Sequence, residues 1–345
     1  MTFDPEAVTE SSSASTPQHV LRHALPACVW LVIPCYNESE ALDVMPQLLL
    51  DELDRLVREG MASPDSRILF VDDGSSDGTW DKIWNLSADH ERVCGLLLSR
   101  NRGHQNALMA GLMAAKDHCD AAISLDADGQ DDIGAMSAML AEYAGGHDVV
   151  YGVRSNRETD PWFKRASAEA FYRLLDSMDV EVVFNHADYR LMSARALEAL
   201  SAFTERNIYL RGLVPLIGFP SAQVEYERAE RTAGKTHYSF RKMLSLAIDG
   251  ITSLSTAPIR MVVGAGFIVT LFGLLISIWS IVMLCLGRTV AGWASLICVV
   301  ALLGGMQLVS VGIIGEYVGK TYLEVKRRPR YIESERTWEG VGQRR

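Results

Sequence analysis

Short apolar runs alternate with amphipathic segments over the first half of the chain. Buried strands are predicted at 28–34, 67–71, 93–98, 121–125 and 148–153, with helices at 40–59, from near Asp77 and at 105–116. Strands that are apolar throughout and alternate with helices indicate a parallel sheet covered on both faces. The pattern therefore predicts an α/β fold.

The next part of the chain is less regular. The predicted elements are a helix at 161–178, an extended or turning segment at 185–192, a helix from an N-cap at Ser193 to Leu200 and a strand at 223–227. Residues 238–256 place their apolar side chains on one helical face. This amphipathic pattern suits a helix lying in a membrane interface, although a surface helix packed on the body has the same pattern.

Two long apolar stretches follow. Residues 261–287 and 292–315 contain no Asp, Glu, Lys or Arg, and each exceeds the roughly 20 residues that cross a bilayer core. Two transmembrane helices are therefore predicted, in preference to a buried helical hairpin in a soluble core. Basic residues flank the pair on both sides, which predicts that both ends are cytoplasmic.

The charge of the chain is divided between its two parts. Residues 1–230 hold 19 Lys and Arg against 37 Asp and Glu, whereas residues 231–345 hold 14 against 6. An acidic body argues against a nucleic-acid groove, and a basic tail suits an anionic surface. The six cysteines show no C-x-x-C spacing, and the polar first 26 residues lack the apolar core of a signal peptide.

Polar tracts follow the ends of the predicted strands. They comprise residues 34–38, 72–79, 99–106, 126–132 and 152–157. Because the carboxyl ends of parallel strands meet at one edge of the sheet, these tracts are expected along a single rim, where ligands bind in such folds. Acidic turns without a shared function would not be expected to lie along one edge of the sheet.

Candidate metal ligands stand in the fourth tract. Asp126 and Asp128 are one residue apart after a strand, so their carboxylates can point at one spot, and Gln130 adds an amide oxygen. These donors suit Mg²⁺ or Mn²⁺, which usually keep positions for substrate phosphates. An acidic turn without a metal is the alternative that these residues alone leave open.

A nucleoside could bind at the first two tracts. Pro34, Tyr36, Glu38, Asp72 and Asp73 offer rings and carboxylates for a base and a ribose. The chain has no G-x-x-x-x-G-K-[ST] and no G-x-G-x-x-G after its first strand, which argues against an NTPase or a dehydrogenase.

The order of several motifs resembles the family-2 inverting glycosyltransferases. The matching motifs are VIPCYNE at 32–38, VDDGSSDGT at 71–79, NRGHQNA at 101–107, DADGQD at 126–131 and YGVR at 151–154. DYRLM at 188–192, ERNIYLRGL at 205–213 and the two apolar stretches make the chain similar to bacterial polyprenyl-phosphate glucosyltransferases and dolichyl-phosphate mannose synthases. The resemblance covers roughly residues 28–330.

The resemblance implies a GT-A-like, mostly parallel Rossmann-type sheet and transfer of a sugar, with inversion, from a nucleotide sugar to a polyprenyl phosphate. The site residues that it implies are Asp188, Arg154 and Arg165 for catalysis; Pro34, Tyr36, Glu38, Asp72, Asp73, Asp126, Ala127 and Asp128 for the nucleotide sugar; Asp126, Asp128 and Gln130 for the metal; and Lys235, His237 and Arg165 for the lipid phosphate. His237 stands where the family usually has Lys and Lys235 where it usually has an acid, so either can be the phosphate contact. The alternative for Asp188 is an N-cap or an ion pair with Arg190, and the alternative for Arg154 and Arg165 is a structural salt bridge. Arg206 and Arg211 are interpreted as structural.

The domain organisation expected from these features has five parts. They are a disordered leader (1–26), a cytosolic catalytic domain (27–237), a juxtamembrane amphipathic helix (238–258), a two-helix anchor in the plasma membrane (259–318) and a basic cytosolic tail (319–345). UDP-glucose is the favoured donor, with GDP-mannose as the alternative, and the expected partners are polyprenyl phosphate, membrane lipids, a second copy of the chain and no nucleic acid. A processive polysaccharide synthase would be expected to have a Q-x-x-R-W tract and more membrane spans, and the sequence has neither. A non-enzymatic two-span scaffold remains the rival from another class.

Overall fold

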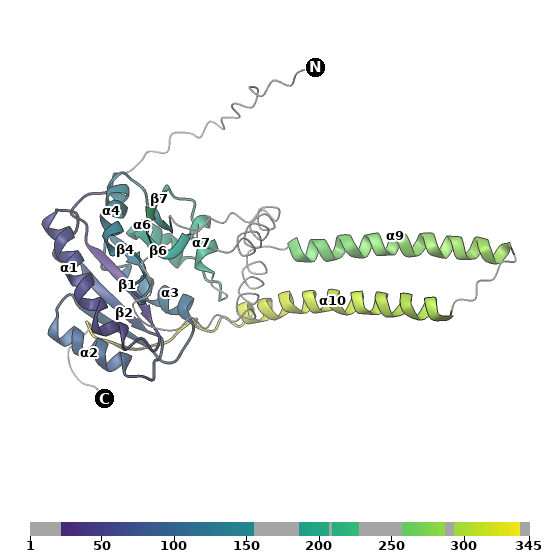
Figure 1. Ribbon diagram of the computed structural model, residues 1–345, viewed down its shortest axis with the longest axis horizontal. Helices are drawn as coiled ribbons and strands as arrows, with labels where there is room; N and C mark the ends of the chain where they lie inside the picture. The colour runs from purple at the N-terminus through teal and green to yellow at the C-terminus, as the bar shows by residue number, and fades with distance from the viewer. Residues whose placement is uncertain (1–21, 155–185, 207–208, 228–256, 287–292, 339–345) are drawn as a thin grey trace, which may run out of the picture.

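A computed structural model describes residues 22–154, 186–206, 209–227, 257–286 and 293–338 of the chain (Figure 1). The described strands form one eight-stranded sheet in the order β7-β5-β6-β4-β1-β2-β3-β8. Their bounds are β1 Val29–Cys35, β2 Arg67–Asp72, β3 Val93–Leu98, β4 Ala121–Ser124, β5 Val149–Arg154, β6 His186–Ser193, β7 Ser221–Tyr226 and β8 Glu333–Arg336.

The sheet is mixed. Strands β1 to β4 pair in parallel, as the apolar pattern predicted, and β5 pairs in parallel with β7. Strand β6 runs antiparallel between β4 and β5, and β8 runs antiparallel to β3. The α/β class is therefore confirmed, and two antiparallel strands are added to a parallel centre.

Helices cover both faces of this sheet. Their bounds are α1 Met45–Arg58, α2 Thr79–Asp89, α3 His104–Ala115, α4 Met136–Ala144, α6 Ala194–Ser201 and α7 Leu210–Leu216, with short 3-10 turns η1 Ala41–Asp43 and η2 Ile133–Ala135. Alternate residues of β1 face opposite ways, as a strand requires. Leu31 and Ile33 pack with α1 and α4, whereas Trp30 and Val32 pack with α3, α6 and α7.

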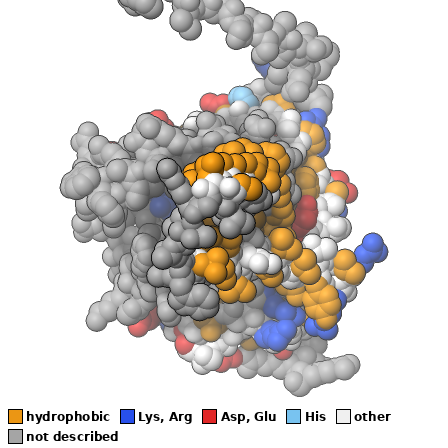
Figure 2. All heavy atoms as spheres, turned by 90° about the vertical axis from the view of Figure 1, so that its right-hand side faces the viewer, with side chains coloured by type: hydrophobic (Ala, Val, Ile, Leu, Met, Phe, Trp, Pro, Cys, Tyr) orange, Lys and Arg blue, Asp and Glu red, His pale blue; other side chains and the backbone are white. Residues whose placement is uncertain are grey.

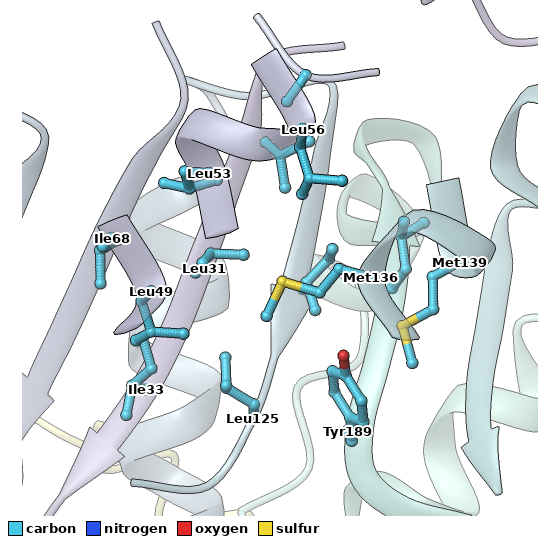
Figure 3. Close-up of a cluster of buried hydrophobic side chains, with 14 of the residues drawn as sticks. Leu31, Ile33, Leu49, Leu53, Leu56, Ile68, Leu125, Met136, Met139 and Tyr189 are labelled. Atoms are coloured by element: carbon cyan, nitrogen blue, oxygen red, sulfur yellow. The ribbon is translucent and has the colours of Figure 1, made fainter. Parts of the chain in front are cut away.

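Figure 3 shows the first of these two cores. The side chains of Leu49, Leu53 and Leu56 on α1 point toward Leu31 and Ile33 of β1, and Met136 and Met139 of α4 lie beside Tyr189 of β6. The i, i+4 and i, i+3 spacing of the α1 leucines places them on one helical face. Their burial fixes the sheet whose edge carries the polar tracts.

The helix predicted at 40–59 is divided in two. Residues 41–43 form η1, Val44 has a non-helical φ of −121°, and α1 begins at Met45. Pro46 explains the break, because proline has no backbone N–H and favours the first turn of a helix. Helices α4 and α7 and strand β8 were not predicted, and the predicted helices 161–178 and 238–256 lie outside the described residues.

Two long helices extend side by side away from the sheet: α9 Ala257–Cys285 and α10 Trp293–Val325 (Figure 1). Counted over the described residues alone, no helix qualifies as long and apolar enough to span a membrane.

After α10 the chain returns to the sheet, where β8 forms the edge strand beside β3 (Figure 1). The Thr337 hydroxyl accepts the Gly95 N–H at 2.8 Å, the Trp80 Nε1–H donates to Glu335, and Trp338 meets the Trp30 ring edge-on at 5.9 Å. Part of the expected basic tail is therefore a strand of the sheet.

Gly74 sits where the chain turns after β2. Its φ is +71°, and a Cβ built on it would lie 2.7–2.8 Å from backbone atoms of Arg100 and Asn101. Gly78 also has a positive φ, +90°, but a Cβ there would meet no atom within 4 Å. The two glycines thus separate the cost of the left-handed conformation from the cost of a collision.

We expect Gly74→Ala to lower the free energy of unfolding by about 2–5 kcal/mol, from backbone strain plus overpacking. Gly78→Ala carries only the strain and should lose about 1–2 kcal/mol. Denaturant unfolding of both variants measures the difference, and equal losses would contradict the collision at Gly74.

Candidate active site

Hydrogen bonds join the first two polar tracts at the rim of the sheet. The Asn37 N–H donates to the Ser75 hydroxyl and the Ser76 N–H donates to the Asn37 amide oxygen, both at 2.9 Å. Asn37 adopts a left-handed φ of 55°, which asparagine tolerates better than most residues. The Ser39 N–H donates to Asp77. The predicted meeting of tracts 34–38 and 72–79 is therefore observed.

Asp73 ties the second tract to the third. Its carboxylate accepts the backbone N–H groups of Arg102 at 2.7 Å and Gly103 at 2.8 Å, so both of its oxygens are engaged. Burial raises the pKa of Asp73 and the adjacent charge of Asp72 adds to this, while the two backbone N–H groups oppose it. In this arrangement Asp73 fixes the loop that leads into His104, the first residue of α3.

Asp188 is the centre of the site. It lies on β6 with only 6 % of its surface exposed. Three cationic or potentially cationic side chains converge on its carboxylate: Arg211 with Nε at 3.2 Å and Nη2 at 3.3 Å, Arg190 with Nη2 at 3.3 Å, and His104 with Nε2 at 3.4 Å. Three elements, α7, β6 and α3, thus meet at one anion.

These partners keep Asp188 ionised. Burial alone would raise its pKa, but the hydrogen bond from His104 and the charges of Arg211 and Arg190 outweigh burial and hold the pKa far below its usual range. A carboxylate with such a low pKa is a weak proton acceptor near neutral pH. Asp188 is therefore suited to holding cations and orienting groups.

His104 connects Asp188 to the predicted metal tract. Its Nε2 lies 3.6 Å from Asp126 Oδ1, and ligand atoms of His104, Asp126 and Asp188 all lie within 4.8 Å of one another. Burial would lower the pKa of His104, but the hydrogen bond to Asp188 and the two carboxylate charges raise it overall. The predicted rim site therefore includes His104, to which the sequence pattern had assigned no role.

The carboxylate oxygens of Asp126 and Asp188 are donors of the kind that a divalent cation binds. Burial raises the pKa of Asp126 to about 6, and the charges of Asp188, Asp131 and Asp128 add to this against the effect of His104. A carboxylate destabilised by neighbouring carboxylates is one whose ionised form a cation would stabilise. Asp128 stands in the adjoining turn, where its Oδ1 accepts the Gln130 N–H at 3.2 Å. Asp126, Asp128 and Gln130 as the ligand set stay a prediction.

Arg154 lies at the end of β5 beside another carboxylate. Its Nη2 is 3.9 Å from Asp131 Oδ1, its Nε donates to the Tyr226 hydroxyl at 3.3 Å, and that hydroxyl donates to Asp131 at 2.6 Å. Asp131 is buried, and its Oδ2 accepts no hydrogen bond from the described residues. Arg154 is thus held at the rim by two residues from neighbouring strands and loops.

The other predicted site residues occupy different depths. Pro34, Asp72 and Ala127 are buried, Glu38 is half-buried and Tyr36 is exposed. Asp72 Oδ1 accepts the Ser75 N–H at 2.7 Å, which holds the turn after β2. The remaining predicted contacts, Arg165, Lys235 and His237, lie outside the described residues.

Two site residues were missed, His104 and Arg211, whereas the ion pair of Asp188 with Arg190, expected as an alternative role of Asp188, is present. His104 and Arg211 stand inside motifs that were quoted from the sequence, NRGHQNA and ERNIYLRGL, but nothing in the sequence indicated their partner. Arg211, interpreted as structural, instead lies against Asp188 at the rim. Arg206 donates its backbone N–H to Glu324 and its side chain to the Arg328 carbonyl, which fits a structural role.

A family model matches the part of the chain that forms most of the sheet. The sequence profile described as glycosyl transferase family 2 matches residues 30–201. This interval contains all of β1 except Val29, the strands β2 to β6, all five rim tracts, Asp126 and Asp188.

Several curated proteins are similar along most of their length. The uncharacterized glycosyltransferase YkoT of Bacillus subtilis (strain 168) is 49 % identical over 301 residues, covering 87 % of this chain and 89 % of that protein. The prophage bactoprenol glucosyl transferase homolog of Escherichia coli (strain K12) is 37 % identical, with 88 % and 97 % covered. The SfII prophage-derived bactoprenol glucosyl transferase of Shigella flexneri is 38 % identical, with 88 % and 96 % covered.

Asp73→Asn should loosen the loop that carries His104. An asparagine amide would place its own N–H₂ against one of the two backbone N–H groups, at a cost of about 1–3 kcal/mol for the unmade hydrogen bond. Hydrogen exchange at Arg102 and Gly103 is expected to accelerate, with a lower unfolding midpoint. Asp89→Asn, at the exposed end of α2, is the control. Unchanged protection at Arg102 and Gly103 would show that Asp73 does not hold this loop.

Proposed function

The chain belongs to glycosyl transferase family 2, and we propose that it transfers a hexose from a nucleotide sugar to the phosphate of a polyprenyl lipid with inversion. A relative at 38 % identity over most of the chain is named a bactoprenol glucosyl transferase, and one at 37 % identity is named a bactoprenol glucosyl transferase homolog. UDP-glucose is the donor that we favour, and Mg²⁺ or Mn²⁺ is the proposed cofactor.

One observation carries this proposal. A carboxylate suited to a cation, Asp126, and a guanidinium, Arg211, flank the same buried Asp188 at the carboxyl ends of the strands. Each of two phosphorylated substrates needs positive charge beside it. A cation bound at Asp126 would supply that charge to one substrate and Arg211 to the other.

The proposed metal would be held by Asp126 and Asp128, with Gln130 contributing its amide oxygen. When bound, it supplies positive charge to the leaving diphosphate. The protein's own residues would do the remaining work: the first two rim tracts would bind the nucleoside through Tyr36 and Glu38, and Arg154 would face a phosphate oxygen.

Charge repulsion is the main obstacle to this reaction. Two unit charges 4 Å apart repel by about 4 kcal/mol at an effective dielectric near 20. The acceptor phosphate is already largely anionic at neutral pH, since its second pKa is about 6. A strong base is therefore unnecessary, which agrees with Asp188 having a pKa held far below its usual range.

We also propose that α9 and α10 anchor the protein in the plasma membrane, with the catalytic body in the cytoplasm. This proposal rests on the sequence, because the charge-free stretches 261–287 and 292–315 cover most of α9 and part of α10. Large apolar side chains are exposed along both helices, among them Phe267, Leu274, Trp279, Leu308 and Val318. Figure 2, viewed from the side of these helices, shows hydrophobic side chains gathered on that face. Such an anchor brings the site to its lipid substrate, and Arg165, Lys235 and His237 would meet the lipid phosphate.

The reaction can be tested by incubating membranes that contain the protein with labelled UDP-glucose, GDP-mannose and other nucleotide sugars and extracting the lipid phase. Label from UDP-glucose in the lipid phase supports the favoured donor, and label from GDP-mannose replaces it by the alternative. No labelled lipid from any donor would overturn the proposed function.

Asp128→Asn should abolish metal-dependent transfer, a loss of about 100-fold or more, because the site loses one of two charges on a shared cation. Asp132→Asn is the matched control, since Asp132 is an exposed residue of the same tract that caps η2, and asparagine caps as well. Full activity of the Asp128 variant, or of the wild type in excess EDTA, would exclude the metal role.

A further inference from the structure

The two guanidinium groups on Asp188 are in unequal surroundings. The side chain of Arg190 is 2 % exposed and that of Arg211 is 41 % exposed, although both lie about 3.3 Å from the same carboxylate. Arg190, Arg211 and His104 share this cluster with two carboxylates, Asp188 and Asp126. Of the two guanidinium groups, Arg211 is the one accessible at the rim.

The backbone around Arg211 is held from two sides. The N–H of Leu210 donates to the Gln105 amide oxygen at 3.0 Å, and the Leu210 carbonyl accepts from Arg190 Nη1 at 3.4 Å. The Asp188 carboxylate accepts hydrogen bonds from Nε and Nη2 of Arg211. A guanidinium fixed in this way is pre-organised, so it loses little freedom when it binds an anion through its remaining Nη1.

The position of α7 indicates which anion. Figure 1 shows α7 on the side of the catalytic body that faces α9 and α10. Asp126 and Asp188 both lie near His104 Nε2, and Arg211 pairs with Asp188 from α7. A diphosphate would be bound near Asp126, and a phosphate arriving from the side of the long helices would approach α7 and Arg211.

We infer that Arg211 binds the phosphate of the polyprenyl acceptor and that Asp188 positions it. This inference rests on the proposed function, because it names a contact for the acceptor of that reaction. It assigns to a residue of α7 a task that the sequence had placed only on Arg165, Lys235 and His237.

The test is steady-state kinetics with the donor and the polyprenyl phosphate varied separately in detergent. Arg211→Gln is expected to raise KM for the polyprenyl phosphate by about 10- to 100-fold, the value of a lost charge-assisted hydrogen bond. KM for the nucleotide sugar, and the thermal stabilisation that UDP with Mn²⁺ gives, should be unchanged. Arg211→Lys keeps the charge without the planar fork and should fall between the two.

Arg195→Gln is the matched control. Arg195 on α6 is 46 % exposed and pairs with a buried carboxylate, Asp148, at 2.8 Å, so it resembles Arg211 in exposure and pairing but lies outside the site. It should leave both KM values unchanged.

Three results would overturn the inference. They are an unchanged KM for the polyprenyl phosphate in Arg211→Gln, an equal rise in KM for the nucleotide sugar, or the same acceptor defect in Arg195→Gln. Failure of the wild type to label any lipid is a separate result, which removes the proposed function together with this contact.

Discussion

Burying a carboxylate away from water costs several kcal/mol unless cations and hydrogen bonds replace the lost hydration. Asp188 is such a carboxylate, and its neutralisation holds the rim together. Arg190 comes from the same strand, His104 from the start of α3 and Arg211 from α7. Removing this anion would leave two guanidinium groups and a histidine facing one another, so the geometry of the whole rim depends on it.

Strand β6 gives Asp188 its place. Because side chains alternate along a strand, Asp188 and Arg190 share one face while Tyr189 and Leu191 share the other. Tyr189 and Leu191 pack into the core beneath α1 and α4. The apolar face of β6 therefore holds the strand in the core. Its other face carries the Asp188 carboxylate and the Arg190 guanidinium that pairs with it.

The sequence could predict whatever depended on local pattern. The apolar runs at 67–71 and 93–98 became β2 and β3 nearly residue for residue, since a strand buried on both faces must be apolar throughout. The rim followed from topology, because parallel strands end at a common edge. Strand β6 was harder: its buried Asp188 and Arg190 interrupt the apolar pattern, so 185–192 could be predicted only as extended or turning.

Partners distant in the sequence could not be predicted at all. Nothing in the residues around Arg211 indicates an ion pair with a carboxylate 23 positions earlier, which exists only because α7 packs across the end of β6. Strand β8 is a similar case: Glu333–Arg336 contains no apolar residue, and it becomes a strand because the edge of β3 offers unpaired backbone groups.

The segment that carries Arg211 is also tied to α10. Glu324, near the end of that helix, accepts the Arg206 N–H at 2.7 Å, and Arg330 donates to the Phe203 carbonyl. On its other side the same segment is held by Asp188 through Arg211. If α10 enters the bilayer as proposed, these bonds relate the depth of the anchor to the position of a site cation. A phosphate on a lipid stays close to the membrane surface, so its meeting with a sugar donor requires that the protein set this distance. The bond of Arg206 to α10 and the bonds of Arg211 to Asp188, five positions apart in the sequence, would set this distance without requiring the body itself to enter the membrane.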